Sequence, residues 1–157
     1  MHGTRCITVS CRRMSSRLAD AVAAEFVLLD RQTAALARTA GLACPPGCGL
    51  CCTTPAVETS VLEMLPMAEE VFRRGESELW SERARATESS QLCLAYEHEP
   101  GHPEKGRCSL YTWRPPICRL YGFAGRLDKH GRAEFVACPV HEAATPAATE
   151  RAAELAL

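Results

Sequence analysis

The sequence has no long hydrophobic run and almost no excess of charge of either sign. Nowhere do roughly 18 consecutive apolar residues occur, so the sequence predicts no transmembrane helix. The 18 basic and 19 acidic residues leave a formal net charge of −1, which gives no long-range field to attract nucleic acid or an anionic membrane. We therefore expect neither a membrane nor a nucleic acid as a partner, and a protein partner stays unspecified.

The N-terminal region also lacks an export signal. Arg12 and Arg13 precede a segment whose apolar residues are interrupted by charges at Arg17, Asp20 and Glu25, whereas a signal peptide has an unbroken apolar core. This absence predicts a cytoplasmic protein, in which thiols stay reduced and disulfides are rare.

Length and composition predict one globular domain. The chain has 157 residues, of which 46% are hydrophobic and 24% are charged, so it can bury a core without covalent cross-links. Residues 1–14 show neither a helical nor a strand period, and chain ends are poorly ordered unless they are tied down. We expect residues 1–14 to be a disordered leader, or to be an extension of the sequence ahead of a true start at Met14. Residues 15–157 are expected to form a single cysteine-cluster domain.

The first part of that domain shows helical periodicity. We expect an amphipathic helix of about six turns from Ser16 to a left-handed Gly41. Its apolar residues recur at three- and four-residue steps: Leu18, Val22, Phe26, Leu29 and Leu36. A second helix is expected from a capping box at Ser60–Glu63 to Gly75, with Pro66 causing a kink or a later start. The apolar side predicted for it carries Val61, Leu65, Ala68 and Phe72.

The later part of the chain predicts shorter elements. A third helix is expected from Ser77 to about Leu92, followed by a polar loop over Glu97–Pro103. Phe123–Leu127 and Ala133–Val136 are separated by a four-residue turn and predict a hairpin, and Thr145-Pro146 begins a short alanine-rich helix. The predicted fold class is therefore mainly α: a small helical domain with a cysteine-rich metal-binding loop region and one short β-hairpin near the C-terminus.

Cysteine is the residue type that the sequence has in excess. Of its 10 cysteines, Cys6 and Cys11 stand apart from the rest. Four crowd into the run CPPGCGLCC and four are dispersed behind it: Cys44, Cys48, Cys51 and Cys52, then Cys93, Cys108, Cys118 and Cys138. Thiols gathered in this way in a reduced compartment indicate a metal ion or an iron–sulfur cluster rather than disulfides. Proline and glycine within the run keep its backbone irregular, which lets it wrap closely around a ligand.

The spacing of the cysteines leaves the metal and the number of centres open. Eight thiolates suffice for two tetrathiolate sites, or for one site plus bystanders, and zinc and iron–sulfur clusters both accept four thiolates. Cys51 and Cys52 are adjacent, and neighbouring side chains diverge in an extended backbone, so we expect them not to bind the same ion. The Cys-x3-Cys-x2-Cys spacing converges well on a cubane, which favours a [4Fe–4S] cluster slightly over zinc.

Other side chains near the cysteines have two interpretations each. Four histidines are possible ligands: His98, His102, His130 and His141. Each is more simply interpreted as a hydrated loop residue. His141, three residues after Cys138, is the best ligand candidate of the four. Arg114 and Arg119 flank Cys118, where they either donate hydrogen bonds to its sulfur or form surface ion pairs. We expect Tyr111 and Tyr121 to be core aromatics.

Two motifs in the same order resemble a known family. The run CPPGCGLCC is followed by a capped helix with Glu63, and the second block contains Gly106–Tyr111 and Arg114–Tyr121. Together they resemble the YkgJ-like CxxCxxCC cysteine-cluster family of zinc- or iron-chelating domains, over about Ala43 to Pro139. The resemblance implies a metal or iron–sulfur site built from the eight clustered cysteines and implies no particular reaction.

Three functions follow as hypotheses. The first is a small metal-binding protein that holds an iron–sulfur cluster or zinc through its thiolates. The second is a group-transfer enzyme with an open iron, which resembles the flagellin lysine methylase, although that protein carries its cluster within a longer chain. The third is a thiol redox or metal-handling module in which Cys52 is an exposed reactive thiol.

Overall fold

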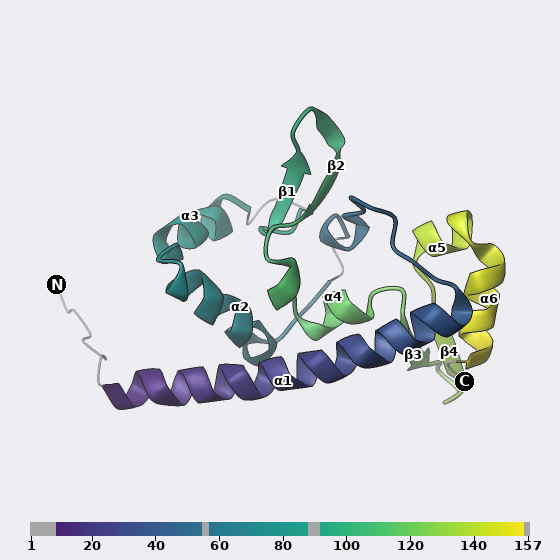
Figure 1. Cartoon of the computed structure of the whole chain (residues 1–157), viewed down its shortest axis with the longest axis horizontal. Helices are drawn as coiled ribbons and strands as arrows, with labels where there is room; N and C mark the ends of the chain where they lie inside the picture. The colour runs from purple at the N-terminus through teal and green to yellow at the C-terminus, as the bar shows by residue number, and fades with distance from the viewer. Residues whose placement is uncertain (1–8, 55–56, 88–91, 156–157) are drawn as a thin grey trace.

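One long helix runs along a side of the molecule, and most of the other elements lie on one side of it (Figure 1). The computed structural model describes residues 9–54, 57–87 and 92–155. Its helices are α1 (Val9–Ala40), α2 (Val61–Arg73), α3 (Ser77–Thr87), α4 (Pro116–Leu120), α5 (Pro139–Ala144) and α6 (Pro146–Leu155). Its strands are β1 (Tyr96–Glu99), β2 (His102–Cys108), β3 (Ala124–Leu127) and β4 (Ala133–Val136), and single 3-10 turns cover Leu50–Cys52 and Tyr111–Trp113. The predicted mainly α fold class is confirmed.

Helix α1 starts earlier than its apolar pattern predicts and ends where predicted. It begins at Val9 rather than Ser16, because a helix extends by adding one hydrogen bond per residue and needs no buried face to do so. Part of the expected leader is thus helical, and residues 1–8 lie outside the described residues. At the other end Gly41 has φ +78°, and the N–H groups of Gly41 and Leu42 both donate to the Ala37 carbonyl, at 2.8 and 2.9 Å. The left-handed glycine cap is confirmed.

Helix α2 has the predicted start but buries a different face. The Ser60 hydroxyl accepts from the Glu63 N–H, and the Glu63 carboxylate accepts from the Ser60 N–H, so the capping box forms. The helix begins at Val61 and continues through Pro66, and a later start is therefore wrong. The predicted apolar side is also wrong, because Val61 is 84% exposed and Phe72 is 55% exposed. The residues that α2 buries are Pro66, Met67, Glu70 and Val71.

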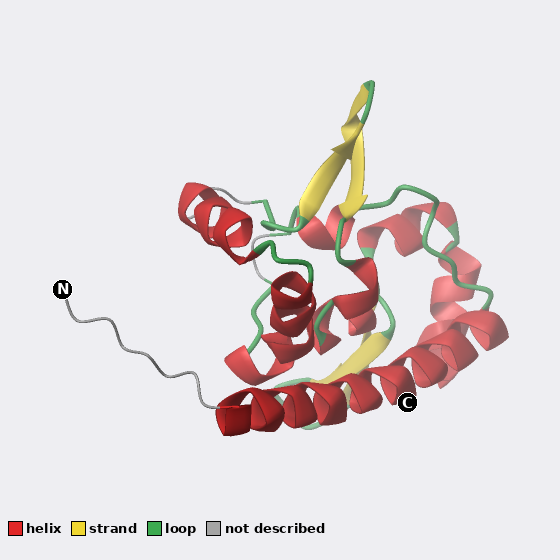
Figure 2. Cartoon of the chain, turned by 60° about the vertical axis from the view of Figure 1, so that its left-hand side comes forward, coloured by secondary structure: helices red, strands yellow, loops and turns green. Residues whose placement is uncertain are grey.

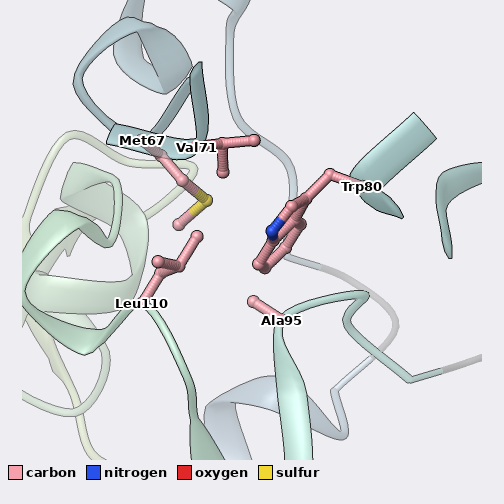
Figure 3. Close-up of a cluster of buried hydrophobic side chains, with 5 residues drawn as sticks. All are labelled: Met67, Val71, Trp80, Ala95 and Leu110. Atoms are coloured by element: carbon pink, nitrogen blue, oxygen red, sulfur yellow. The ribbon is translucent and has the colours of Figure 1, made fainter. Parts of the chain in front are cut away.

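The buried face of α2 is determined by a hydrophobic core that three parts of the chain share (Figure 3). Met67 and Val71 of α2 pack with Trp80 of α3 and with Ala95 and Leu110, which lie just outside the first hairpin. Burial of each of the larger apolar side chains stabilises the folded state by about 1.5–3 kcal/mol. This core fixes the first hairpin against α2 and α3.

The described part of the chain contains two antiparallel hairpins, of which one was predicted. β1 and β2 replace the polar loop expected over residues 97–103, and they form a hairpin that projects from the body of the molecule (Figure 2). Pro100-Gly101, with Gly101 at φ +79°, supplies the tight turn. The second hairpin, β3 with β4, is confirmed. Helix α3 ends at Thr87, short of the expected Leu92, and residues 88–91 lie outside the described residues.

The C-terminal helix α6 packs against the end of α1 and confirms the predicted alanine-rich helix. Ala148 and Ala152 of α6 form a small core with Ala40 and Leu42. Arg151 donates two hydrogen bonds to the Ala40 carbonyl, at 3.1 and 2.8 Å, and so satisfies one of the unpaired carbonyls that end a helix. Within the described ranges, no helix combines the length and the apolar character that crossing a membrane requires.

Candidate metal centre

The first cysteine segment is a tightly coiled loop. The Cys48 N–H donates to the Pro45 carbonyl at 3.1 Å, and the Cys52 N–H donates to the Gly49 carbonyl at 2.8 Å. The second of these bonds belongs to the 3-10 turn Leu50–Cys52. The loop is thus more regular than the sequence predicted, and it gathers its four sulfur atoms within a short length of backbone.

Two glycines dock this loop onto the first hairpin. A Cβ atom on Gly49 would lie 2.5 Å from the Tyr96 ring and 2.6 Å from the Gly106 carbonyl oxygen. A Cβ atom on Gly106 would lie 2.4 Å from the same ring. Because glycine has no Cβ, the two backbones can approach this closely. The contact holds the first cysteine segment against strand β2.

The hairpin then brings two dispersed cysteines to the loop. Cys93 lies just before β1, and its N–H donates to the Cys52 carbonyl at 2.8 Å. Cys108 ends β2, where it pairs with Tyr96 of β1 in the antiparallel register. Cys93 and Cys108 are 15 positions apart in the sequence. Both lie beside the same cysteine loop, because antiparallel pairing brings the end of β2 back to the start of β1.

Cys52 is the centre of a compact group of thiols. Its thiol lies close enough to those of Cys108, Cys51 and Cys93 for each of them to shift its pKa. We call these four residues the Cys52 cluster. Cys51 and Cys52 lie in a 3-10 turn rather than in the extended backbone that was expected, and whether they bind the same ion stays a prediction. Cys52 is also only 5% exposed, so the hypothesis of an exposed reactive thiol at this position is wrong.

The thiols of the Cys52 cluster titrate as a group. The hydrogen bond with Cys52 lowers the pKa of Cys93 to about 6 and that of Cys51 to about 7, and it lowers the pKa of Cys108 as well. The pKa of Cys52 is raised by its hydrogen bonds with Cys108, Cys51 and Cys93. One S–H group carries one proton, so the cluster loses its protons stepwise. It therefore carries thiolates near neutral pH, which is the form that binds metals.

Cys118 reaches the same region from a separate segment. Pro115 is extended, with φ −69° and ψ 167°, and Pro116 opens helix α4. Burial, followed by the charges of the neighbouring cysteines, raises the pKa of Cys118 to about 12; those cysteines are Cys51, Cys93 and Cys108. Cys118 is thus a fifth sulfur close to the Cys52 cluster.

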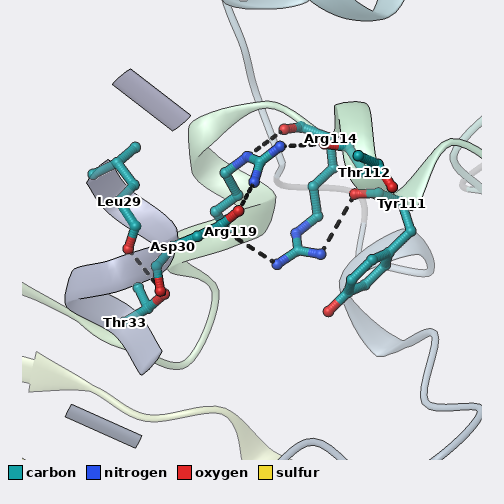
Figure 4. A network of polar contacts seen from close by, with 7 residues as sticks. All are labelled: Leu29, Asp30, Thr33, Tyr111, Thr112, Arg114 and Arg119. Atoms are coloured by element: carbon teal, nitrogen blue, oxygen red, sulfur yellow. Dashed lines mark hydrogen bonds and ion pairs between the residues drawn. The ribbon is translucent and has the colours of Figure 1, made fainter. Parts of the chain in front are cut away.

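Arg119 anchors the segment that carries Cys118 (Figure 4). Its side chain is buried and donates hydrogen bonds to the Asp30 carboxylate of α1, to the Thr112 carbonyl and, at 2.8 Å, to the Arg114 carbonyl. These contacts are neither of the two that the sequence predicted, a bond to sulfur or a surface ion pair. Arg119 therefore ties α1 to the segment that carries Cys118.

Arg114, unlike Arg119, acts electrostatically on the thiols. Its guanidinium stacks 3.7 Å from the centre of the Tyr111 ring and lies 3.8 Å from an Asp30 carboxylate oxygen. Among the smaller contributions, its positive charge favours the thiolate forms of Cys51 and Cys118. Tyr111 is 57% exposed, so its prediction as a core aromatic is wrong: the arginine covers one face and solvent the rest.

A second group of ligand side chains lies at the other end of the cysteine loop. Cys138 precedes helix α5 as its N-cap, and His141 lies in the first turn of that helix. His141 Nε2 is 3.8 Å from Cys44 Sγ, and His141 is only 1% exposed. Its interpretation as a solvated loop histidine is therefore wrong, whereas the other three candidate histidines are exposed: His98, His102 and His130.

Six of the cysteines line one cavity of about 440 Å³: Cys48, Cys51, Cys52, Cys93, Cys108 and Cys118. Apolar side chains also line it, among them Met64, Met67 and Leu94. All eight clustered cysteines are free thiols, and thiolates with one imidazole are the donors that zinc and iron–sulfur centres use. In the described part of the chain no three His, Cys, Asp or Glu side chains are already arranged around a single point as metal ligands. Ligation therefore requires side-chain rotation.

Sequence reasoning missed the parts of the site that depend on tertiary contacts. Neither the Gly49–Gly106 approach nor the Asp30–Arg119 pair has a local signal. One weaker signal was present, the Pro100-Gly101 dipeptide for the first hairpin.

The comparisons with known proteins agree with this geometry. A family model named CxxCxxCC, described as "Putative zinc- or iron-chelating domain", matches residues 43–142. The matched range contains all eight clustered cysteines and His141. Neither a curated protein nor a solved structure shows significant similarity to the chain.

Proposed function

The chain belongs to the CxxCxxCC family, and on that premise we propose that it is a metal-binding protein whose clustered thiolates hold an inorganic centre. The ligands are drawn from Cys44, Cys48, Cys51, Cys52, Cys93, Cys108, Cys118 and Cys138. The preferred centre at the Cys52 cluster is an iron–sulfur cluster of the [4Fe–4S] type, and zinc is the alternative. A cluster supplies one-electron redox chemistry, and zinc supplies a structural cross-link.

One observation carries this proposal. The Cys52 thiol lies close enough to interact with the thiol of Cys51 in its own segment and with those of Cys93 and Cys108, which come later in the chain. Thiolates this close repel one another, and each disfavours ionisation of the next. A bound cation offsets that repulsion, which gives a physical reason for concentrating these residues at one place.

The cavity favours a cluster over a single ion. A zinc ion holds four sulfur atoms at about 2.3 Å from its centre and fills little volume. A cavity of about 440 Å³ lined by six cysteines has room for a larger group. Arg114 lies at its edge, where a positive charge offsets part of the negative charge of a tetrathiolate centre.

Purification without oxygen tests the proposal. Iron, acid-labile sulfide and zinc are quantified per chain, and the absorption spectrum is recorded in the visible range. We expect iron and sulfide in stoichiometric amounts with sulfur-to-iron charge-transfer absorption, or zinc in stoichiometric amount without it. A folded preparation that holds neither metal, before or after reconstitution, contradicts the proposal.

A second candidate, group transfer at an open iron, is favoured by the apolar side chains that line the same cavity. Met64, Met67 and Leu94 leave space for another molecule beside the thiols. Adding S-adenosylmethionine to the reduced, iron-loaded protein tests this candidate by electron paramagnetic resonance. A changed cluster spectrum supports it, and an unchanged spectrum argues against it.

A further inference from the structure

His141 is a buried residue whose hydrogen bonding is incomplete. It is 1% exposed, and its Nδ1 atom has no hydrogen-bond partner among the described residues. Its ring edge packs against Phe123, with ring centres 4.9 Å apart, which accounts for its burial and leaves Nδ1 unsatisfied. Buried polar atoms of this kind are rare in native proteins, but Nδ1 is not the ring nitrogen that faces Cys44.

The other ring nitrogen faces a thiol at a distance that a shared ion would give. His141 Nε2 is 3.8 Å from Cys44 Sγ. Bonds of about 2.3 Å from zinc to sulfur and about 2.0–2.1 Å to nitrogen, at a tetrahedral angle, place the two ligand atoms about 3.6 Å apart. Only a small rotation of either side chain is needed for both atoms to reach one ion.

Two further thiols lie beside this pair. A Cβ atom on Gly122 would be 2.5 Å from Cys138 Cβ and 3.2 Å from His141 Nδ1, so Cys138 and the imidazole lie against the same point of the backbone. Gly122 has φ +77°, and its lack of a side chain permits this approach. Cys48 follows Cys44 across the turn that the Cys48 N–H closes on the Pro45 carbonyl, and it also lines the cavity beside the Cys52 cluster.

Cys44 lies near the thiols of Cys48 and Cys138, and also near that of Cys51. The thiols that act on Cys52 are those of Cys108, Cys51 and Cys93.

We infer that Cys44, Cys48, Cys138 and His141 form a second centre, a three-thiolate, one-imidazole site for a single zinc ion, separate from the Cys52 cluster. Mixed sulfur and nitrogen ligands in tetrahedral arrangement are typical of structural zinc sites. The centre joins the start of the cysteine loop to helix α5. The inference rests on the proposed function for its three thiolates and adds His141, which lies outside the proposed set of cysteine ligands.

Cobalt(II) titration of the iron-loaded protein tests the second centre, with iron content measured in the same samples. The wild type is expected to bind one further equivalent of Co²⁺ with the d–d and sulfur-to-cobalt bands of a tetrahedral site, and Zn²⁺ is expected to displace it. His141→Ala is expected to lose that equivalent and to retain its iron. His130→Ala, in an exposed turn of the second hairpin, is the matched control and is expected to match the wild type.

His141→Cys guards against the case in which the alanine variant does not fold. It is expected to bind Co²⁺ with the stronger charge-transfer bands of four thiolates, a result that a purely structural role of the imidazole would not produce. The second centre is contradicted if His141→Ala and His141→Cys both give the wild-type cobalt spectrum, or if loss of His141 removes iron and cobalt together. A wild type that holds iron but binds no extra Co²⁺ contradicts only the second centre, whereas a wild type that binds neither contradicts the proposed function too.

Discussion

Gly49 in the cysteine loop lies directly against Gly106 in strand β2, so closely that a Cβ atom on Gly49 would be 2.6 Å from the Gly106 carbonyl oxygen. This contact places the Cys48–Cys52 turn beside the two cysteines that the hairpin carries. The position of the Cys52 cluster therefore depends on two residues that have no side chain.

Gly49→Ala is expected to separate the loop from the hairpin. The added methyl group would meet backbone as well as the Tyr96 ring, and overpacking of this kind costs about 1–3 kcal/mol. We expect the free energy of unfolding in urea to fall by that amount and metal content per chain to fall with it. Gly125→Ala, whose nearest contact is 3.3 Å away in strand β4, is the matched control. Equal stability and equal metal content in the two variants would contradict the docking role of Gly49.

Arg119→Met is expected to loosen the second cysteine segment from α1. The variant leaves Asp30 without its buried partner and leaves two carbonyls without donors, and breaking such a network costs about 2–4 kcal/mol. Arg126→Met is the control, because the Arg126–Glu134 pair is exposed and such pairs contribute about 0–1 kcal/mol. Chemical denaturation of both metal-free variants measures the difference, and equal losses would rule out Arg119 as an anchor.

The thiols are expected to react with iodoacetamide in a defined order in the metal-free, reduced protein. Cys93 has a pKa lowered from 9.0 to about 6, and Cys118 has a pKa raised to about 12. At pH 7 Cys93 is therefore mostly thiolate and reacts early, and Cys118 stays protonated and reacts later than Cys93. Peptide mass spectrometry after timed labelling measures the order, and labelling of Cys118 as fast as Cys93 would contradict it.

The same shifts predict how stability of the metal-free protein depends on pH. A folded-state pKa below the unfolded value stabilises the folded protein at high pH, so the contribution of Cys93 appears as pH rises from about 6 to 9. Cys118 acts in the opposite direction above pH 9.

Because the Cys93 shift comes chiefly from its hydrogen bond with Cys52, Cys52→Ala is expected to move the Cys93 labelling midpoint upward by at least one pH unit. An unchanged midpoint in Cys52→Ala would show that Cys52 is not the cause.

Removal of metal is expected to lower the melting temperature. Ligands from separate segments are joined only in the loaded state, and a metal present at about 1,000 times its Kd adds about 4 kcal/mol to the free energy of unfolding. Scanning calorimetry of loaded and chelated protein measures the change. Cys6→Ser, at a cysteine outside the clustered eight, is expected to keep the full shift, and an equal melting temperature with and without metal would refute the cross-linking role.

The sequence was informative where local rules apply and silent where distant residues meet. The Gly41 cap, the Ser60–Glu63 capping box and the β3–β4 hairpin were predictable because each depends on a few adjacent residues. The buried face of α2 was not predictable, because the position of Trp80 and Leu110 decides which side is covered. Helix periodicity alone does not distinguish Val61 from Met67 as the buried residue.

The same division applies to the candidate centre. The ligand residue types follow from composition and spacing, so the eight cysteines were identifiable without coordinates. Their grouping was not, because Cys51 and Cys52 share one cluster only through a 3-10 turn. The burial of His141 depends on Phe123 and Gly122, which no local pattern connects to Cys44.

The most direct test of the account compares the metal content of Cys51→Ser and Cys108→Ser, each purified without oxygen and reconstituted alongside the wild type. One residue belongs to each cysteine segment, and in the account a single centre bridges them. We predict that both variants lose the same metal in the same proportion while the wild type stays fully loaded. A Cys108→Ser protein that folds and keeps the wild-type metal content would contradict the central claim.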